Sequence, residues 1–168
     1  IQSLCWDRSG ILWIGVESGL IKYNPKSNRF ISIQMDPNEQ HATTGNWILS
    51  IYEDRSDILL VGTGYGGIKI FDRRTKRFTS FSHNPGDEQS ISDNTVMCIF
   101  QGETDILWIG TWEGVNKLDP RKTQFTKIEH DPGDSNTLSS NFIWSIYSSY
   151  PENKPYLWIG TKTDGLNK

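Results

Sequence analysis

Short apolar segments recur along the chain, and their spacing is the first indication of its fold. The segment Leu12–Gly15 reads L-W-I-G, and the same letters return at Leu107–Gly110 and Leu157–Gly160, with L-L-V-G at Leu59–Gly62. The starts at 12, 59, 107 and 157 are 47, 48 and 50 residues apart. A period of this length is typical of repeat architectures in which each copy is one supersecondary unit. The sequence therefore contains four copies of one unit.

Each copy contains four apolar runs with polar or glycine-containing breaks between them. In the second copy the three short breaks predict antiparallel hairpins, and the long stretch His83–Asn94 predicts a crossing to the next unit. Four antiparallel strands in a repeat of roughly 40–50 residues are typical of a β-propeller blade. A helical solenoid would show a period of about 3.6 residues, which these runs lack. The runs are Trp47–Glu53, Ile58–Gly62, Gly67–Phe71 and Arg77–Ser82.

We therefore predict an all-β protein, a β-propeller fragment of about four blades of four antiparallel strands in which the last blade is incomplete. The L-W-I-G strand has no polar face, so it should be buried between neighbouring blades, with its glycine allowing a close approach. The open ends should expose strand edges and apolar faces. Either the remaining blades of an array or a second copy of the chain, as a homodimer, should cover them. The fragment spans residues 1–168, with repeats approximately at 1–46, 47–94, 95–141 and 142–168.

Composition and charge narrow the range of partners. The formal net charge is −3 with acids and bases interspersed, so there is no basic field to hold nucleic acid. The longest apolar runs are about six residues, far below a membrane span, so we expect no direct membrane contact. Cys5 and Cys98 occupy different repeat positions and are expected to be small buried apolar residues. The chain begins at Ile1 rather than Met, which favours a piece of a longer protein.

The sequence offers no convincing catalytic constellation, metal site or cofactor site. His83 and His130 take the same place in successive loops and are expected to form hydrogen bonds there. The segment Thr63–Gly67 is glycine-rich but lies between two strands, whereas a phosphate loop needs a helix N-terminus. We therefore predict a non-enzymatic segment, with catalytic, metal and cofactor residues all absent. A lyase on a related propeller is the least favoured alternative, since it needs a histidine or carboxylate pair near the axis.

Acidic loops follow the fourth run of the first three copies. They lack the dense alternating carboxylates of a calcium loop, so turn formation explains them better. They begin at Asp36, Asn84 and Asp131.

The loops at one rim offer the best candidate binding site. If the first strand of each repeat is innermost, the loop entering it and the loop between strands two and three share one face. Aromatic residues there differ between copies, so the fold does not require them. Exposed rings beside polar groups suit a carbohydrate, which stacks on rings and bonds through hydroxyls. The candidate ligand-binding residues are Trp112, Tyr65, Trp47, Glu113 and Glu17.

Other residues of this rim have less certain roles. Phe142 and Lys162 are placed on the same face, and Trp144 is expected on an inner strand, where it would either line the channel or pack. The aromatic candidates would alternatively cover loop cores or pack against a neighbouring domain. Asn46, Asn94 and Asn141 recur at one position and are expected to close loops.

The repeat reads I-x-S-I-Y-E-D-x-x-x-x-L-W-I-G-T-x-x-G-G-L-x-K-x-D-P-x-x-x-x-F, then H-x-P-G-D-x-x-S-L-S-x-N. This resembles the two-component regulator propeller repeat, and the resemblance covers essentially the whole chain. It departs at Leu60, where Trp is usual, and at Gln101–Gly102 and Ser148–Ser149, where acidic E-D is common.

This resemblance implies a function. Such repeats fill the extracytoplasmic, periplasmic sensor region of membrane-anchored hybrid histidine kinases, so we expect a segment that recognises an oligosaccharide and signals across the membrane through a phosphorelay. The alternative is a protein–protein interaction scaffold that binds no small molecule.

Overall fold

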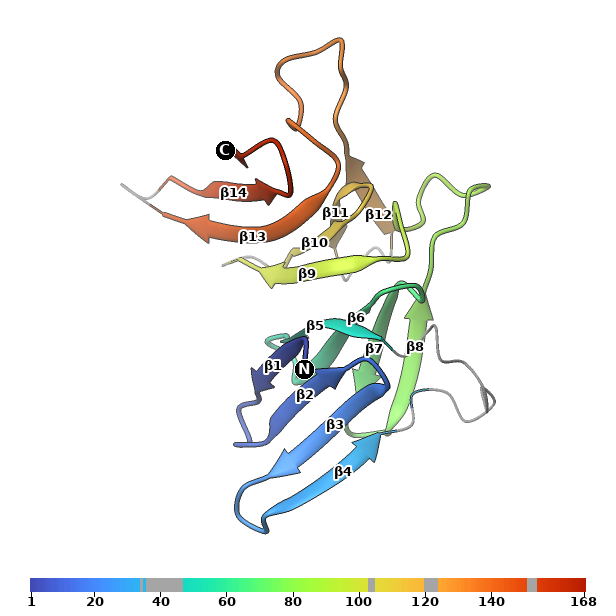
Figure 1. Ribbon diagram of the computed structural model, residues 1–168, viewed down its shortest axis with the longest axis vertical. Coiled ribbons are helices and arrows are strands. Elements are labelled where there is room, and N and C mark those ends of the chain that lie inside the picture. Colours follow the sequence, from blue (N-terminus) through green and yellow to red (C-terminus); the bar gives the residue numbers. More distant parts are fainter. Residues whose placement is uncertain (34, 36–46, 103–104, 120–123, 151–153) are drawn as a thin grey trace.

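A computed structural model of the chain describes residues 1–33, 35, 47–102, 105–119, 124–150 and 154–168. Every regular element in these ranges is a β-strand, and the strands form four separate antiparallel sheets (Figure 1). Within each sheet, every strand pairs with the next one along the chain, so every sheet is a meander. The predicted fold class is confirmed, including the incomplete last blade, whose sheet has three strands.

The four sheets are the blades of the propeller. The first contains β1 (Ser3–Trp6), β2 (Leu12–Val16), β3 (Gly19–Asn24) and β4 (Arg29–Ile33). The second contains β5 (Ile48–Glu53), β6 (Ile58–Thr63), β7 (Ile68–Asp72) and β8 (Arg77–Phe81). The third contains β9 (Val96–Gln101), β10 (Leu107–Thr111), β11 (Gly114–Asp119) and β12 (Gln124–Ile128). The fourth contains β13 (Ile143–Ser149), β14 (Tyr156–Thr161) and β15 (Leu166–Asn167).

The blades follow one another in chain order, from β1–β4 at the bottom of Figure 1 to β13 and β14 at the top. The first strands contact one another, β1 with β5, β5 with β9, and β9 with β13. These strands therefore line the common axis, as the sequence analysis assumed. The turns between second and third strands consequently lie at the same rim as the entrances of the inner strands.

The same side-chain contact recurs at each boundary between blades. A β-branched residue at the start of an inner strand lies against the glycine of the L-W-I-G strand in the preceding blade. A Cβ added to that glycine would come within 2.6 Å of a γ-carbon of the β-branched residue at every boundary. Real Cβ contacts are not that short, so only glycine allows the blades to approach this closely. The pairs are Gly15–Ile48, Gly62–Val96 and Gly110–Ile143.

Apolar side chains fill the rest of each boundary, as the L-W-I-G pattern predicted. Trp13 is almost fully buried between the first two blades and meets Phe71 edge-on, with ring centroids 5.9 Å apart. Leu60, which takes the Trp position in the second blade, is equally buried in the core shared with the third blade. Trp158 in the last blade is only half-buried. Trp108, which faces the three-stranded fourth blade, is also half-buried and packs against the core of that boundary. Residues at this position are therefore fully buried where the following blade is complete.

The crossing loop between the second and third blades explains the H-x-P-G-D-x-x-S-L-S-x-N motif. The His83 N–H donates to Asn94 Oδ1 at 2.7 Å, and His83 Nδ1 lies 2.8 Å from the Ile91 carbonyl oxygen. Ile91 is buried in the core of the boundary, and the Ser92 N–H donates to Asn116 Oδ1 on β11 at 2.8 Å. The loop is thus closed on itself and attached to the following blade.

The next crossing loop repeats this arrangement. The His130 N–H donates to Asn141 Oδ1 at 2.6 Å, and the Ser139 N–H donates to Asn167 Oδ1 at 2.9 Å. The loop roles predicted for the two histidines and for Asn94 and Asn141 are confirmed. Turn hydrogen bonds also shape the acidic loops, since the Gly133 N–H donates to Asp131 Oδ1 at 2.8 Å. Asn46 and the loop that begins at Asp36 lie outside the described residues.

A charged cluster of Asp7, Arg8, Glu53 and Arg73, here called the latch, joins the first two blades. It lies at the rim opposite the turns between second and third strands. The Arg8 N–H from the β1–β2 turn donates to Glu53 Oε2 at 2.9 Å. Arg73 from the β7–β8 turn reaches back to Asp7 Oδ2 at 2.7 Å and also pairs with Glu53. A related contact joins the second and third blades, where the Arg55 N–H donates to the side chain of Gln101.

The carboxyl of Asp7 organises both the turn and the latch. It accepts hydrogen bonds from the Ser9 hydroxyl at 2.6 Å, from the Ser9 and Ile11 N–H groups, each at 2.9 Å, and from Trp13 Nε1 at 2.8 Å. Burial acts to raise the pKa of this carboxyl, but those hydrogen bonds and the charge of Arg73 hold the pKa below its usual value. The ionised form of Asp7 is therefore the one that the fold stabilises.

The two cysteines are unpaired and half-buried. Burial raises the pKa of the Cys98 thiol to about 12, and burial also raises the pKa of Cys5. Both thiols therefore stay protonated at neutral pH and pack as small apolar groups.

The glycine contact predicts a difference between two matched substitutions. In Gly62→Ala the added methyl would overlap Ser50 of its own sheet and Val96 of the next blade, whereas in Gly160→Ala it would meet only the equivalent serine, Ser145. We expect Gly62→Ala to lower the free energy of unfolding by about 1–3 kcal/mol, and Gly160→Ala to lower it clearly less. Urea denaturation measures both, and equal losses would show that the blade contact is not the constraint.

The latch predicts a stability that depends on pH. The pKa of Asp7 is lower in the folded chain than in the unfolded chain. The contribution of ionised Asp7 to the free energy of unfolding is therefore fully present above the unfolded pKa of about 4, and it is lost as the pH falls through the pKa of the folded chain. We expect Asp7→Asn to cost about 1–3 kcal/mol at pH 7, with the gap to wild type closing below about pH 4. Urea denaturation at several pH values, with exposed Asp105→Asn as the control, checks this. A gap that stays constant with pH would contradict it.

Candidate functional site

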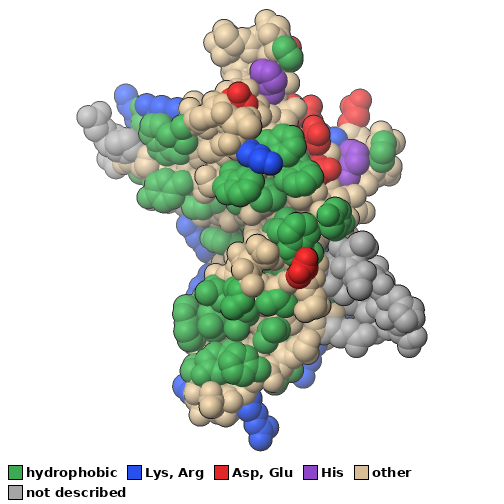
Figure 2. Space-filling model, viewed as in Figure 1, with side chains coloured by type: hydrophobic (Ala, Val, Ile, Leu, Met, Phe, Trp, Pro, Cys, Tyr) green, Lys and Arg blue, Asp and Glu red, His purple; other side chains and the backbone are tan. Residues whose placement is uncertain are grey.

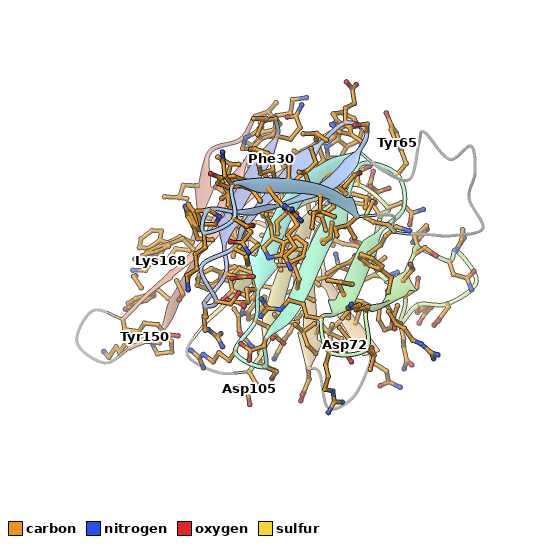
Figure 3. The ribbon with its side chains drawn as sticks, turned by 90° about the horizontal axis from the view of Figure 1, so that it is seen from below. Phe30, Tyr65, Asp72, Asp105, Tyr150 and Lys168 are labelled. Carbon is orange, nitrogen blue, oxygen red and sulfur yellow. The ribbon has the colours of Figure 1, made fainter. Side chains whose placement is uncertain are left out.

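The predicted site lies at the rim that Tyr65 marks in Figure 3, whereas Asp72, Asp105 and Tyr150 lie at the opposite rim. We call the first of these the loop rim. It contains the turns that follow β2, β6, β10 and β14, and the residues that precede β5, β9 and β13. Three of the five candidates belong to two groups there, one in the second blade and one at the boundary of the third and fourth.

The first group consists of Trp47 and Tyr65. Their ring centroids lie 5.8 Å apart at an interplanar angle of 42°. The Gly64 N–H donates to the Trp47 carbonyl oxygen at 2.8 Å, and the Trp47 ring covers Gly64 so closely that an added Cβ would lie 2.6 Å from Cε3. Trp47 is half-buried, whereas Tyr65 is 56% exposed. Trp47 therefore supports the turn, and Tyr65 presents its ring to solvent.

The second group, the aromatic cluster, consists of Trp112, Phe142, Trp144 and Lys162. The centroids of Trp112 and Phe142 lie 5.4 Å apart at 40°. The Lys162 N–H donates to the Phe142 carbonyl oxygen at 2.9 Å, and its Nζ lies 5.3 Å from the Phe142 centroid and 6.0 Å from that of Trp144. All three rings are exposed, and Figure 2 shows hydrophobic side chains gathered on this part of the molecule. The cluster joins the third blade to the fourth.

The two acidic candidates are less firmly connected to these groups. Glu113 follows Trp112 in the β10–β11 turn, and its exposed side chain lies beside the aromatic cluster in sequence. Its N–H donates to Thr111 Oγ1 at 3.2 Å, which orders the turn. Glu17 is exposed in the β2–β3 turn of the first blade. Among the described residues, no hydrogen bond or ring contact joins Glu17 to the other four candidates.

Phe142, Trp144 and Lys162 belong to this rim although the candidate set omits them. The repeat register contains the signal for two of them, because Phe142 takes the position of Trp47, and Lys162 lies in the turn equivalent to those of Tyr65 and Trp112. Trp144 is the extra residue of a β-bulge in β13, where the register shifts between Ile143 and Ser145. Bulges redirect side chains, and no sequence pattern marked this one.

A large hollow lies away from the loop rim, at the latch. It has a volume of about 770 Å³ and is lined by Arg8, Arg73, Arg74 and the neighbouring turns. The guanidinium groups of Arg8 and Arg73 already bind Asp57, Asp7 and Glu53. This hollow is therefore the surface of a contact between blades rather than a free charged site.

Two further kinds of feature are absent from the described ranges. No three or more His, Cys, Asp or Glu side chains come together there in a group that could hold a metal ion. These ranges also contain no helix of the length and hydropathy needed to cross a membrane.

Comparisons with known proteins identify the repeat. The family model of the two component regulator propeller matches residues 90–113. The chain is 26% identical to the extracellular domain assigned to the hybrid two-component system BT3049 of B. thetaiotaomicron, with a TM-score of 0.79 over 98% of this chain and 22% of that one. No curated protein matches the chain.

Two more distant structures share the fold. The extracellular domain assigned to the hybrid two-component system BT4673 of B. thetaiotaomicron is 22% identical, with a TM-score of 0.79 over 99% of this chain and 21% of that one. Virginiamycin B lyase of Staphylococcus aureus is 13% identical, with a TM-score of 0.64 over 97% of this chain and 49% of that one. At these identities the likeness shows the fold alone.

The chain spans about a fifth of the length of the B. thetaiotaomicron domains. Those domains are extracellular domains of putative hybrid two-component systems, and 98–99% of this chain superposes on part of them. The chain is therefore a β-propeller segment in which residues 90–113 match the two component regulator propeller repeat, and the other three blades share the L-W-I-G pattern of that repeat.

Proposed function

We propose that this chain is an extracytoplasmic, ligand-sensing propeller segment of a two-component sensor. The observation that carries the proposal is its superposition, over 98% of its length, on the extracellular domain of a hybrid two-component system. In this proposal the segment lies in the periplasm, within a membrane-anchored receptor whose histidine kinase starts a phosphorelay. The segment itself binds without catalysing a reaction.

The loop rim is the proposed binding surface, and an oligosaccharide is the proposed ligand. Tyr65 and Trp112 present exposed rings, on which the apolar face of a sugar can stack. Glu113 follows Trp112 in the same turn, and Lys162 Nζ lies over the Phe142 ring that contacts Trp112. Both side chains can bond hydroxyl groups. The repeat does not need these rings, because the equivalent turns carry Glu17 in the first blade and Lys162 in the fourth, with no aromatic residue.

A ligand at the aromatic cluster would contact two blades at once. Trp112 comes from the β10–β11 turn, and Phe142 precedes β13, so their ring contact crosses a blade boundary. A ligand changes a receptor only by binding one arrangement better than another. Because the cluster is shared, a ligand that stacks on both rings favours one relative position of the third and fourth blades, which supplies a physical basis for signalling.

Calorimetry with a panel of oligosaccharides tests the proposal. We expect at least one glycan to bind, and Trp112→Ala to weaken it about tenfold, which corresponds to roughly 1.4 kcal/mol of lost stacking. Tyr65→Ala should also weaken it if the ligand spans both groups. Trp6→Ala is the matched control, since Trp6 is exposed away from the loop rim.

The competing function is a protein–protein scaffold. In that case no glycan would bind, and replacing Tyr65 and Trp112 together would damage the assembly of the receptor instead. Binding of a peptide or protein but of no glycan, with the same two residues required, would overturn the carbohydrate proposal and support the scaffold.

A further inference from the structure

A hollow lies between the first two blades, and we call it the side hollow. It has a volume of about 320 Å³, which is at the lower end of the range for small-molecule sites. Strands β2, β3 and β4 line one side of it, and β7, β8 and the turn between them line the other (Figure 1). Both blades are complete, with four paired strands each, so the side hollow does not depend on either end of the chain. None of its described lining residues belongs to the loop rim.

A difference between two blade boundaries explains why this space is there. At the second boundary Phe81 of β8 meets Phe125 of β12 edge-on, with ring centroids 5.9 Å apart. The strand register places Ile33 at the position of Phe81, and Phe78 at that of Phe125. Isoleucine is smaller than phenylalanine, and Phe78 stacks instead on Phe71 of its own blade, with centroids 4.5 Å apart. The ring contact that fills the second boundary therefore has no counterpart at the first.

The side hollow combines apolar side chains with positive charge. Three cations line it, and none of its described lining residues is acidic. The guanidinium of Arg73 binds two carboxylates of the latch, so its charge is compensated. Lys22 Nζ lies 5.8 Å from the centroid of the buried Trp13 ring, which holds this ammonium group at the hollow. Within the described ranges no carboxylate forms an ion pair with Lys22 or Lys76.

Lys76 is not required by the turn that carries it. Its φ of 56° lies in the left-handed region, and so does the φ of 51° at Asn28, which takes the same place in the first blade. Asparagine adopts this conformation more readily than lysine does. The turn itself would therefore favour asparagine at both positions. A sparsely populated backbone conformation that persists points to a role for its side chain, and this side chain brings a charge to the side hollow.

We infer that the side hollow binds a small organic acid. Its carboxylate bonds the ammonium groups of Lys22 and Lys76, and its hydrocarbon part packs on Ile31, Ile33 and Phe78. The two uncompensated ammonium groups select an anion, because charge-assisted hydrogen bonds are the strong ones. The apolar lining and the small volume favour a compact hydrocarbon chain or ring over a peptide. The site is separate from the loop rim, so it does not rest on the proposed function.

Octanoate is the probe that tests the inference, and octanol, which has the same chain length without the charge, is its control. Each is titrated into the 168-residue chain and followed by two-dimensional NMR. We expect octanoate at millimolar concentrations to shift the resonances of Ile33, of Phe78 and of the Trp13 indole N–H. Octanol should bind at least about fivefold more weakly, because it cannot form the charge-assisted hydrogen bonds.

Two substitutions act on the two halves of the site. Ile33→Phe supplies the ring that Phe81 supplies at the second boundary, so it should fill the hollow and abolish octanoate binding. Lys76→Asn gives this turn the residue of the first blade, and it should weaken octanoate binding about fivefold while leaving octanol binding unchanged. Lys117→Asn is the matched control, since Lys117 Nζ also lies 5.8 Å from a tryptophan centroid but at another boundary. Thermal melts confirm that each variant is folded.

Several outcomes would overturn the inference. Octanoate that shifts none of these resonances, or octanol that binds equally well, is one kind. Another is octanoate binding that Ile33→Phe or Lys76→Asn leaves unchanged, or that Lys117→Asn weakens as much as Lys76→Asn does. An acidic, leucine-containing pentapeptide titrated in the same way tests the competing occupant, and shifts caused by the peptide but not by octanoate would make the side hollow a peptide site. Shifts that depend on protein concentration alone would assign it to a second copy of the chain instead.

Discussion

Three glycines determine how closely the blades of this propeller can approach. At Gly15, Gly62 and Gly110 the absence of a side chain leaves room for a β-branched residue from the next blade. The buried cores on either side of each contact, with Trp13 in one and Leu60 in another, are closed by that approach. A shift of one residue in any of these strands would exchange its two faces and remove the contact. Sheet register and blade packing therefore depend on the same positions.

The loop rim depends on this contact through the chain itself. Trp47 and Phe142 directly precede Ile48 and Ile143, which are two of the residues that enter the glycine contacts. Fixing the β-branched residue fixes the start of the inner strand, and with it the position of the ring before it. The candidate binding surface is thus an extension of the packing between blades. The residues of this surface differ from blade to blade, but the repeated glycine contact positions them in the same way, as is common for loops on rigid scaffolds.

The sequence predicted most of the architecture because the repeat presents each signal several times. Strand bounds in the second blade agree to within one residue, and the roles of His83 and Asn94 followed from their recurrence in the loop. The partners within the site were not predictable. Trp112 meets Phe142 across a blade boundary, and Trp144 is redirected by a bulge. Such contacts depend on side-chain direction and on the angle between sheets, which hydrophobic periodicity does not encode.

The Ser92–Asn116 and Ser139–Asn167 hydrogen bonds change where one structural unit ends and the next begins. Each of the two described crossing loops leaves one blade by its outer strand and buries one residue in the core shared with the next blade, while Ser92 or Ser139 donates to an asparagine of that next blade. Unfolding of the following blade therefore removes part of the packing of the loop and one of its hydrogen bonds, even if its own blade remains intact. In a repeat protein, stability passes between nearest neighbours. Here part of that coupling passes through the crossing loop, so local unfolding of one blade also loosens the loop that precedes it along the chain.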